Sequence, residues 1–105
     1  MKEEQAYLCP VTATLSVIGG LWKPIILYAL QKGSKRFGQL AAIIPGISRK
    51  ILTEQLKELE QQGLITRTEF QELPPRVVYE LSTKGLSLKP LMDAMSDWGN
   101  EYVLS

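Results

Sequence analysis

The spacing of apolar positions predicts two short helices at the start of the chain. Val11, Leu15 and Ile18 recur at helical spacing after Pro10, which suits a first helical position, so a helix is expected over residues 10–18. Residues 22–31 are apolar on nearly all sides and are followed by Gly33, a typical helix stop. This second helix is therefore predicted to be central and buried.

Two further helices are predicted next, separated by a tight turn. Apolar residues at i, i+3, i+4 and i+7 define a helix over residues 37–44, with Ser34 as a candidate cap. Pro45-Gly46-Ile47 forms the turn, and Ser48 caps a helix that runs to about Gln62. Two helices joined by a three-residue turn containing glycine have the form of a helix-turn-helix, here over about residues 37–62.

After Gly63 the pattern changes to that of strands. Residues 64–71 and 76–82 are rich in β-branched and aromatic side chains, and Glu72-Leu-Pro-Pro joins them. The pair predicts a β-hairpin over about residues 64–82, and a hairpin directly after a helix-turn-helix is the wing of a winged helix. The predicted fold is mainly α: a single winged helix-turn-helix domain over residues 1–105 with one β-hairpin wing.

A final helix is predicted over about residues 84–103. Pro90 either lies in its first turn or kinks a longer helix that begins near Lys84. One stripe of this helix is apolar at spacings of 3, 4, 3 and 4, which is most often core packing. In so small a domain the second helix already fills the centre, so the stripe is also a candidate dimer interface; it comprises Leu88, Leu91, Met95, Trp98 and Tyr102.

The charge is unevenly distributed along a chain of 105 residues whose formal net charge is only +1. Residues 21–50 contain six basic and no acidic residues, a local balance of +6 against −5 for the remainder. Such asymmetry is typical of a nucleic-acid contact surface. The six basic residues are Lys23, Lys32, Lys35, Arg36, Arg49 and Lys50.

Several classes of function are excluded by residues that the chain lacks. It has no histidine and one cysteine, Cys9, so imidazole-based catalysis, the common zinc sites and an internal disulfide are ruled out. No paired catalytic arrangement and no phosphate-binding glycine motif is visible, and we expect no enzyme, cofactor or metal site. The first residues of the sequence include both basic and acidic side chains, which argues against a signal peptide. No apolar run is long enough to span a membrane. A soluble cytoplasmic protein is therefore expected.

A series of short strings along nearly the whole chain resembles the HxlR family of bacterial transcriptional regulators, a branch of the winged-helix regulators related to the MarR type. The resemblance implies a homodimer that binds an operator, often as a repressor, and in several members responds to oxidants or electrophiles through an N-terminal cysteine. Arg49 departs from the glutamine expected in many relatives, which leaves the operator sequence open. The strings are Cys9-Pro-Val, Ile18-Gly-Gly-Leu-Trp-Lys-Pro, Lys35-Arg-Phe, Ile44-Pro-Gly-Ile-Ser, Leu52-Thr, Leu56-Lys-Glu-Leu, Gly63-Leu, Pro74-Pro-Arg-Val, Tyr79-Glu-Leu and Asp97-Trp-Gly.

Candidate DNA-binding residues lie on the fourth predicted helix and around the third. Ser48, Arg49, Lys50 and Thr53 face away from the apolar side and suit phosphates and base edges of a major groove. The competing interpretation is a solvated helix face with an i, i+4 pair between Lys50 and Glu54.

Three basic residues outside that helix are further candidates. Lys35 and Arg36, at the start of the third helix, suit backbone phosphates, although basic pairs are more often solubilising surface residues. Arg76, beside Pro74-Pro75 at the hairpin tip, suits an adjacent minor groove or, alternatively, blunts an exposed strand edge.

Cys9 is the candidate redox-sensing residue. If Pro10 is the first helical residue, the Cys9 thiol sits at the cap, where free backbone amides stabilise a thiolate, while Glu3 and Glu4 oppose it. A lone cysteine is more often a small buried apolar residue.

We expect a sequence-specific regulator that binds double-stranded DNA as a homodimer at an inverted repeat; the alternative is a winged helix that binds protein partners without DNA.

Overall fold

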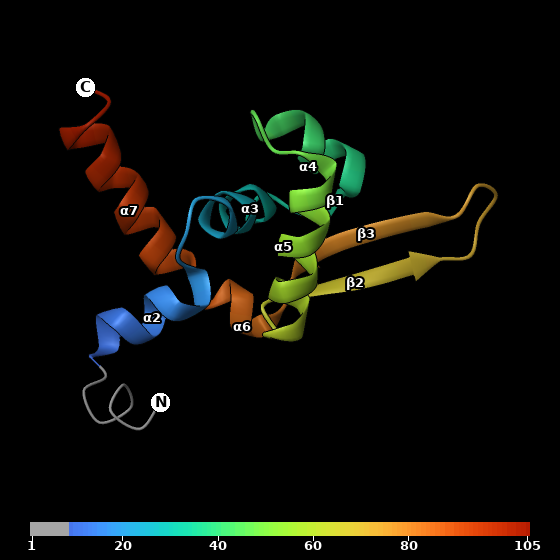
Figure 1. The fold of residues 1–105 in the computed structure, drawn as a ribbon, viewed down its shortest axis with the longest axis horizontal. Helices are drawn as coiled ribbons and strands as arrows, with labels where there is room; N and C mark the ends of the chain where they lie inside the picture. Colours follow the sequence, from blue (N-terminus) through green and yellow to red (C-terminus); the bar gives the residue numbers. More distant parts are fainter. Residues whose placement is uncertain (1–8) are drawn as a thin grey trace.

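In the computed structural model, residues 9–105 form helices around a small antiparallel sheet (Figure 1). The charged start of the chain, including Glu3 and Glu4, lies outside the described residues. The elements, in order, are α2 Pro10–Ile18, α3 Trp22–Leu30, β1 Lys35–Arg36, α4 Phe37–Ile43, α5 Arg49–Gln61, β2 Ile65–Phe70, β3 Arg76–Leu81, α6 Thr83–Leu86 and α7 Lys89–Tyr102.

The predicted mainly helical winged fold is confirmed, and local signals explain why α5 begins and ends where it does. The Ser48 hydroxyl accepts a hydrogen bond from the backbone N–H of Ile51 at 3.0 Å, which satisfies one free amide of the first turn. At the other end Gly63 adopts φ 77°, a left-handed conformation that glycine tolerates without steric cost. Gly46, at φ 79°, makes the turn between α4 and α5 in the same way.

A short strand before α4 was not predicted. Lys35 and Arg36 form β1, which pairs antiparallel with β3, so that the sheet has the order β1-β3-β2. The expected Ser34 cap is wrong: Arg36 is the N-cap residue of α4, and its backbone N–H donates to the side-chain oxygen of Gln39 at 2.8 Å. Both basic residues are therefore fixed on the sheet rather than on the first turn of a helix.

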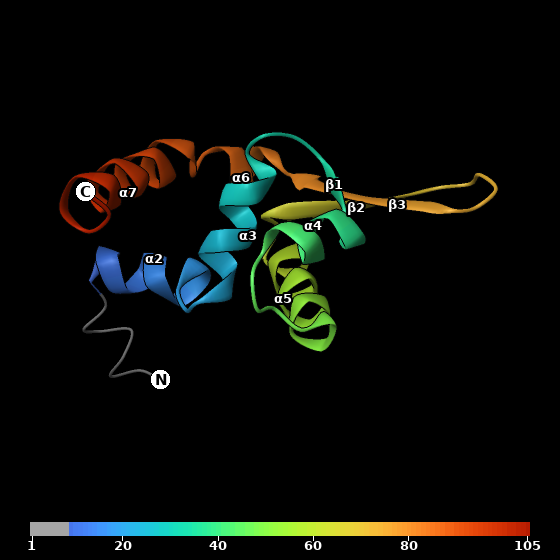
Figure 2. The same ribbon diagram turned by 90° about the horizontal axis from the view of Figure 1, so that it is seen from above.

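The predicted wing is confirmed as the β2–β3 hairpin. The two strands pair antiparallel from Ile65 opposite Leu81 to Phe70 opposite Arg76. Figures 1 and 2 both show the hairpin extending away from the helices, with α2 and α7 at the opposite end of the molecule. The extents are 51 × 40 × 26 Å, so the molecule is elongated along the direction of the wing.

The C-terminal segment forms two helices rather than one. Pro90 lies in the first turn of α7, as one of the two alternatives expected, and the longer kinked helix is not formed. The short helix α6 fits closely against the start of the wing, where a Cβ atom on Gly85 would collide with the carbonyl oxygen of Leu64. That close fit places α7 at a defined position relative to the sheet.

The core is aliphatic and centres on α3, as its apolar composition predicted. Ile26, Leu27 and Leu30 of α3 are buried together with Leu40 of α4 and with residues of α5, the sheet and the turn before β2: Leu52, Leu56, Leu59, Leu64, Ile65 and Leu81. In the described part, no single helix is long and apolar enough to cross a bilayer; α2 and α3 pass that test only as a pair bent by 78°.

Candidate nucleic-acid interface

One face at the start of α5 presents polar and basic side chains to solvent. Ser48, Arg49, Lys50 and Thr53 are exposed, while the opposite face of the helix is buried through leucines of the core. The exposed positions agree with the sequence prediction that this face points away from the core. The face is free to approach a ligand as large as a duplex.

The two hydroxyl groups on this face are already engaged within α5. Ser48 Oγ accepts the cap hydrogen bond, and Thr53 Oγ1 donates to the carbonyl oxygen of Arg49 at 2.8 Å. Thr53 therefore keeps only acceptor lone pairs and a methyl group, whereas Ser48 keeps its hydroxyl hydrogen. The strong donors that remain are the guanidinium of Arg49 and the ammonium of Lys50.

Arg49 also links α5 to the start of α4. Its guanidinium lies over the Phe37 ring, 5.4 Å from the ring centroid, a cation–π contact that limits the positions the side chain samples. The ion pair between Lys50 and Glu54, given above as an example of what a solvated face would show, is not formed within residues 9–105. Lys50 is thus available to an external anion.

The sheet brings Lys35 and Arg36 next to Arg76, although forty residues separate them in sequence. Because β1 pairs with β3, the three residues line one small polar hollow of about 210 Å³, together with Ser34, Gln39 and Val78. Three basic residues grouped at one concave surface are a candidate for a phosphate contact. Gln39 was missed in the sequence, where its position three residues after the cap is the signal that could have identified it.

Two contacts hold the Arg76 side chain in place, and neither was predicted from its position beside two prolines. Its guanidinium lies 4.3 Å from the centroid of the Phe70 ring and 3.1 Å from a carboxylate oxygen of Glu72. These contacts keep the side chain against the wing and partly offset its charge. Any groove contact by Arg76 therefore begins from a position beside the strands rather than from the extreme tip.

Lys23 belongs to the basic stretch but has a structural role. Its ammonium forms a 2.7 Å ion pair with Glu58 of α5, and the Lys23 side chain is only 13% exposed. The pair connects α3 with α5, where the Glu58 side chain is 51% exposed. Sequence alone could not separate this residue from the other five, since the separation depends on how the two helices cross.

The apolar stripe of α7 is mostly exposed. Leu88 packs against the core, but Leu91, Met95, Trp98 and Tyr102 are 37%, 43%, 61% and 68% exposed. Trp98 and Tyr102 lie with ring centroids 5.2 Å apart. Two adjacent aromatic side chains, with their ring planes tilted by 41°, on an open helix face are typical of a surface that a partner covers.

A second exposed apolar surface, on α2 and at the start of α3, was not predicted. Val11, Leu15 and Leu21 are 65%, 57% and 65% exposed. Their spacing of four and six residues is visible in the sequence, but only the fold shows that the core does not cover them. Since α2 and α7 lie at the same end of the molecule in both views, the two surfaces can contribute to one interface (Figures 1 and 2).

Cys9 occupies the helix cap expected for it. It is the N-cap residue of α2 with Pro10 following, and its thiol is exposed. Hydrogen bonds from the backbone and hydroxyl of Thr12, and from the backbone of Val11, lower the pKa of the Cys9 thiol below its ordinary value. The thiolate is the reactive form, so the thiol is both accessible and activated.

Comparison with known proteins identifies the family. Residues 17–105 match the HxlR-like helix-turn-helix family. The chain belongs to that family. HTH-type transcriptional regulator YdeP of Bacillus subtilis is 46% identical over 94 residues, which are 90% of this chain and 73% of YdeP. The HxlR-like proteins are transcriptional regulators rather than enzymes.

Two redox-related proteins are among the solved structures similar to this HxlR-like chain. The oxidised form of the redox regulator HypR has a TM-score of 0.85 and 43% identity, covering 89% of this chain and 96% of that one. The reduced form of the regulator YodB from B. subtilis has a TM-score of 0.79 and 36% identity, covering 91% and 95%. The winged-helix arrangement is thus shared over nearly the whole length.

Proposed function

We propose that this HxlR-like protein is a repressor that binds an inverted-repeat operator as a homodimer, acting on DNA in the cytoplasm. The observation that carries the proposal is the pair of neighbouring basic surfaces: Arg49 and Lys50 at the start of α5, and Lys35, Arg36 and Arg76 around the polar hollow. The contact between Arg49 and Phe37, the residue after Arg36, joins the two surfaces. A duplex can meet α5 in its major groove and the second surface at its backbone.

The homodimer is proposed on the exposed surfaces of α2 and α7. A two-fold axis at that end of the molecule leaves the two α5 helices and the two wings free on the outside. For helix-turn-helix dimers the two reading helices enter successive major grooves, about 34 Å apart. The operator is therefore expected to be an inverted repeat with half-sites one duplex turn apart.

Binding to DNA is tested by selecting bound fragments from random duplexes and measuring their affinity at several salt concentrations. Neutralised phosphates release counterions, so the logarithm of the affinity should fall linearly with the logarithm of salt, with a slope of about −0.9 for each phosphate contact. We expect an enriched inverted repeat and a steep slope. Absence of enrichment and a flat salt dependence would support a protein-binding winged helix instead.

We further propose that Cys9 makes the regulator responsive to oxidants or electrophiles. Its cap position at the end of α2 places it beside the proposed dimer surface, and HypR and YodB are similar proteins solved in different redox forms. Two Cys9 thiols, one from each protomer, can form a disulfide by giving two electrons and two protons to an oxidant such as diamide. A mixed disulfide or an electrophile adduct at the same sulfur requires only one protomer.

The lowered pKa of Cys9 predicts fast alkylation at neutral pH. A lowered pKa means that the thiolate fraction persists to lower pH, so the rate of alkylation by iodoacetamide should reach half its maximum at a lower pH than for N-acetylcysteine measured in parallel. Thr12→Val removes the hydroxyl that donates to the sulfur at 3.7 Å and should move the midpoint upward. Thr14→Val is the matched control, because its hydroxyl bonds to the carbonyl of Pro10 instead.

The regulatory role of Cys9 has a separate readout. Operator affinity before and after diamide should differ in the wild type and stay unchanged in Cys9→Ser. Equal affinities in all four samples would show that Cys9 has no part in regulation, whatever its pKa.

A further inference from the structure

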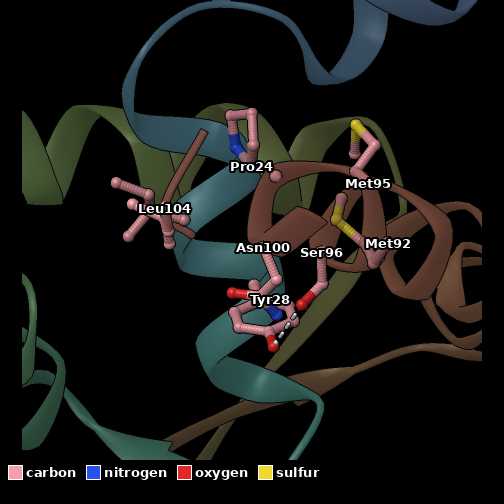
Figure 3. Close-up of a pocket in the computed structure, with 9 residues that line it drawn as sticks. Pro24, Tyr28, Met92, Met95, Ser96, Asn100 and Leu104 are labelled. Atoms are coloured by element: carbon pink, nitrogen blue, oxygen red, sulfur yellow. Dashed lines mark hydrogen bonds between the residues drawn. The ribbon is translucent and has the colours of Figure 1, made fainter. Parts of the chain in front are cut away.

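An open hollow lies between α3 and α7, away from the basic surfaces and the redox residue. Its volume is about 480 Å³, within the range of sites that bind small molecules. Its wall is mainly apolar: Ile25 contributes from α3, and Met92 and Met95 contribute from α7 (Figure 3). Methionine side chains are flexible and polarisable, so they adapt to flat or irregular ligands.

A small polar group interrupts the apolar wall. The hydroxyls of Tyr28 and Ser96 are 3.2 Å apart, and Asn100 lies beside them (Figure 3). That distance is long for a hydrogen bond between two oxygens, which is ordinarily below about 3.0 Å. When one hydroxyl donates to the other, one O–H hydrogen and several lone pairs stay unused, and the Asn100 amide adds further donors and an acceptor.

No charged side chain lines the hollow. At Gly99 the wall leaves open space that a larger side chain would occupy. The side chains of its wall are apolar, hydroxyl or amide, so nothing there stabilises a charged ligand. Gly99 lies on the wall, and a Cβ atom at this position would meet no atom within 4 Å. Leu104, whose backbone N–H donates to the Gly99 carbonyl at 2.9 Å, lies at the rim.

The hollow is distinct from the proposed dimer surface. Trp98 and Tyr102, the two most exposed residues of the α7 stripe, do not line it, and only Met95 belongs to both. A second copy packed on the stripe is therefore expected to cover a neighbouring face of α7 and to leave the hollow open.

We propose that this hollow is an effector site for an uncharged aromatic molecule of two or three rings that carries one hydroxyl or carbonyl oxygen. The rings lie against the methionines and Ile25, and the oxygen bonds to Tyr28, Ser96 or Asn100. The consequence for DNA binding rests on the proposed function. It follows from α3, which forms one wall of the hollow and is joined to α5 through the ion pair of Lys23 with Glu58.

Binding is tested without DNA, using the fluorescence of N-phenyl-1-naphthylamine, an uncharged aromatic probe. We expect saturable binding of one probe per chain in the dimer. Gly99→Leu should weaken it at least tenfold by filling the hollow, while Gly99→Ala, the matched control, adds one methyl group and should bind within about threefold of wild type. Thermal unfolding of both variants verifies that they fold.

Two competitors test the chemistry of the ligand. The sulfonate-bearing analogue 1-anilinonaphthalene-8-sulfonate should bind at least tenfold more weakly than the uncharged probe. 2-Naphthol should displace the probe better than naphthalene, and this preference should disappear in the Tyr28→Phe, Ser96→Ala double variant. Unweakened binding in a folded Gly99→Leu, equal affinity for the sulfonate, or probe binding that is lost as the dimer forms would each overturn the proposal.

The regulatory consequence has its own measurement. Saturating 2-naphthol should change the affinity for the selected duplex at least fivefold in wild type and not in Gly99→Leu. Probe binding with no duplex binding at any salt would leave the effector site standing and refute the DNA proposal. Duplex binding that saturating 2-naphthol leaves unchanged would instead refute the coupling.

Discussion

Replacing Lys35, Arg49 and Lys50 together with alanine is expected to abolish sequence-specific DNA binding. A side chain that contacts a base contributes about 1–3 kcal/mol, and a phosphate contact contributes about one unit of the salt slope. A dimer carries each substitution twice, so operator affinity should fall at least a thousandfold. Fluorescence anisotropy of a labelled operator at several salt concentrations gives both the affinity and the slope.

The single substitutions separate the roles of the three residues. Lys35→Ala should weaken binding evenly across sequences and lower the salt slope, because the residue lies on β1 at the polar hollow rather than at the start of α5. Arg49→Ala or Lys50→Ala should relax specificity at one position of each half-site. Lys89→Ala is the control, since that ammonium is paired with Asp93 on α7. A triple variant with wild-type affinity and slope would exclude α5 as the DNA-binding helix.

Trp98→Ala is expected to disrupt the homodimer. Trp98 is 61% exposed and lies against Tyr102, so its contacts within the chain are few and its removal should leave the melting temperature of the isolated protomer nearly unchanged. At an interface, a buried tryptophan is commonly an energetic hot spot worth about 2 kcal/mol or more. The dimer dissociation constant should therefore rise about thirtyfold or more, measured by sedimentation over a range of concentrations.

Leu73→Ala provides the comparison for the dimer prediction. Leu73 is fully exposed at the turn of the wing, far from α7 in both views, and its truncation should not alter the dissociation constant. If both variants sediment as wild type, the stripe on α7 is not the interface. If wild type is a monomer at micromolar concentration even with operator DNA, no homodimer forms.

Local signals in the sequence were sufficient for most of the elements. Ser48 and Gly63 mark the two ends of α5 because capping and left-handed turns depend on a few neighbouring residues. The strand β1 could not be predicted in the same way, because two residues become a strand only when β3, forty positions later, pairs with them. Tertiary pairing decides such short elements.

In the candidate site, too, local features could be predicted from the sequence, and features that depend on contacts between distant segments could not. The exposed face of α5 follows from helical periodicity, and the cap position of Cys9 follows from the proline after it. The grouping of Arg76 with Lys35, and the withdrawal of Lys23 into an ion pair, depend on contacts between distant segments. The hollow between α3 and α7 was invisible for the same reason, since its hydroxyl pair joins residues 68 positions apart.

The elongation of the molecule along the wing has a mechanical consequence. The helices α2 and α7 lie at one end of the 51 Å axis and the wing at the other, so in the proposed dimer each protomer is a lever whose pivot is the end formed by α2 and α7. A rotation of about 5° at that pivot displaces the far end by roughly 4 Å, comparable to the rise of one base pair. Because β1 ties the start of α4 to the wing, the DNA-facing parts travel together. If the proposed dimer forms, a modest change of angle between its protomers is thus enough to put both halves out of register with the proposed operator.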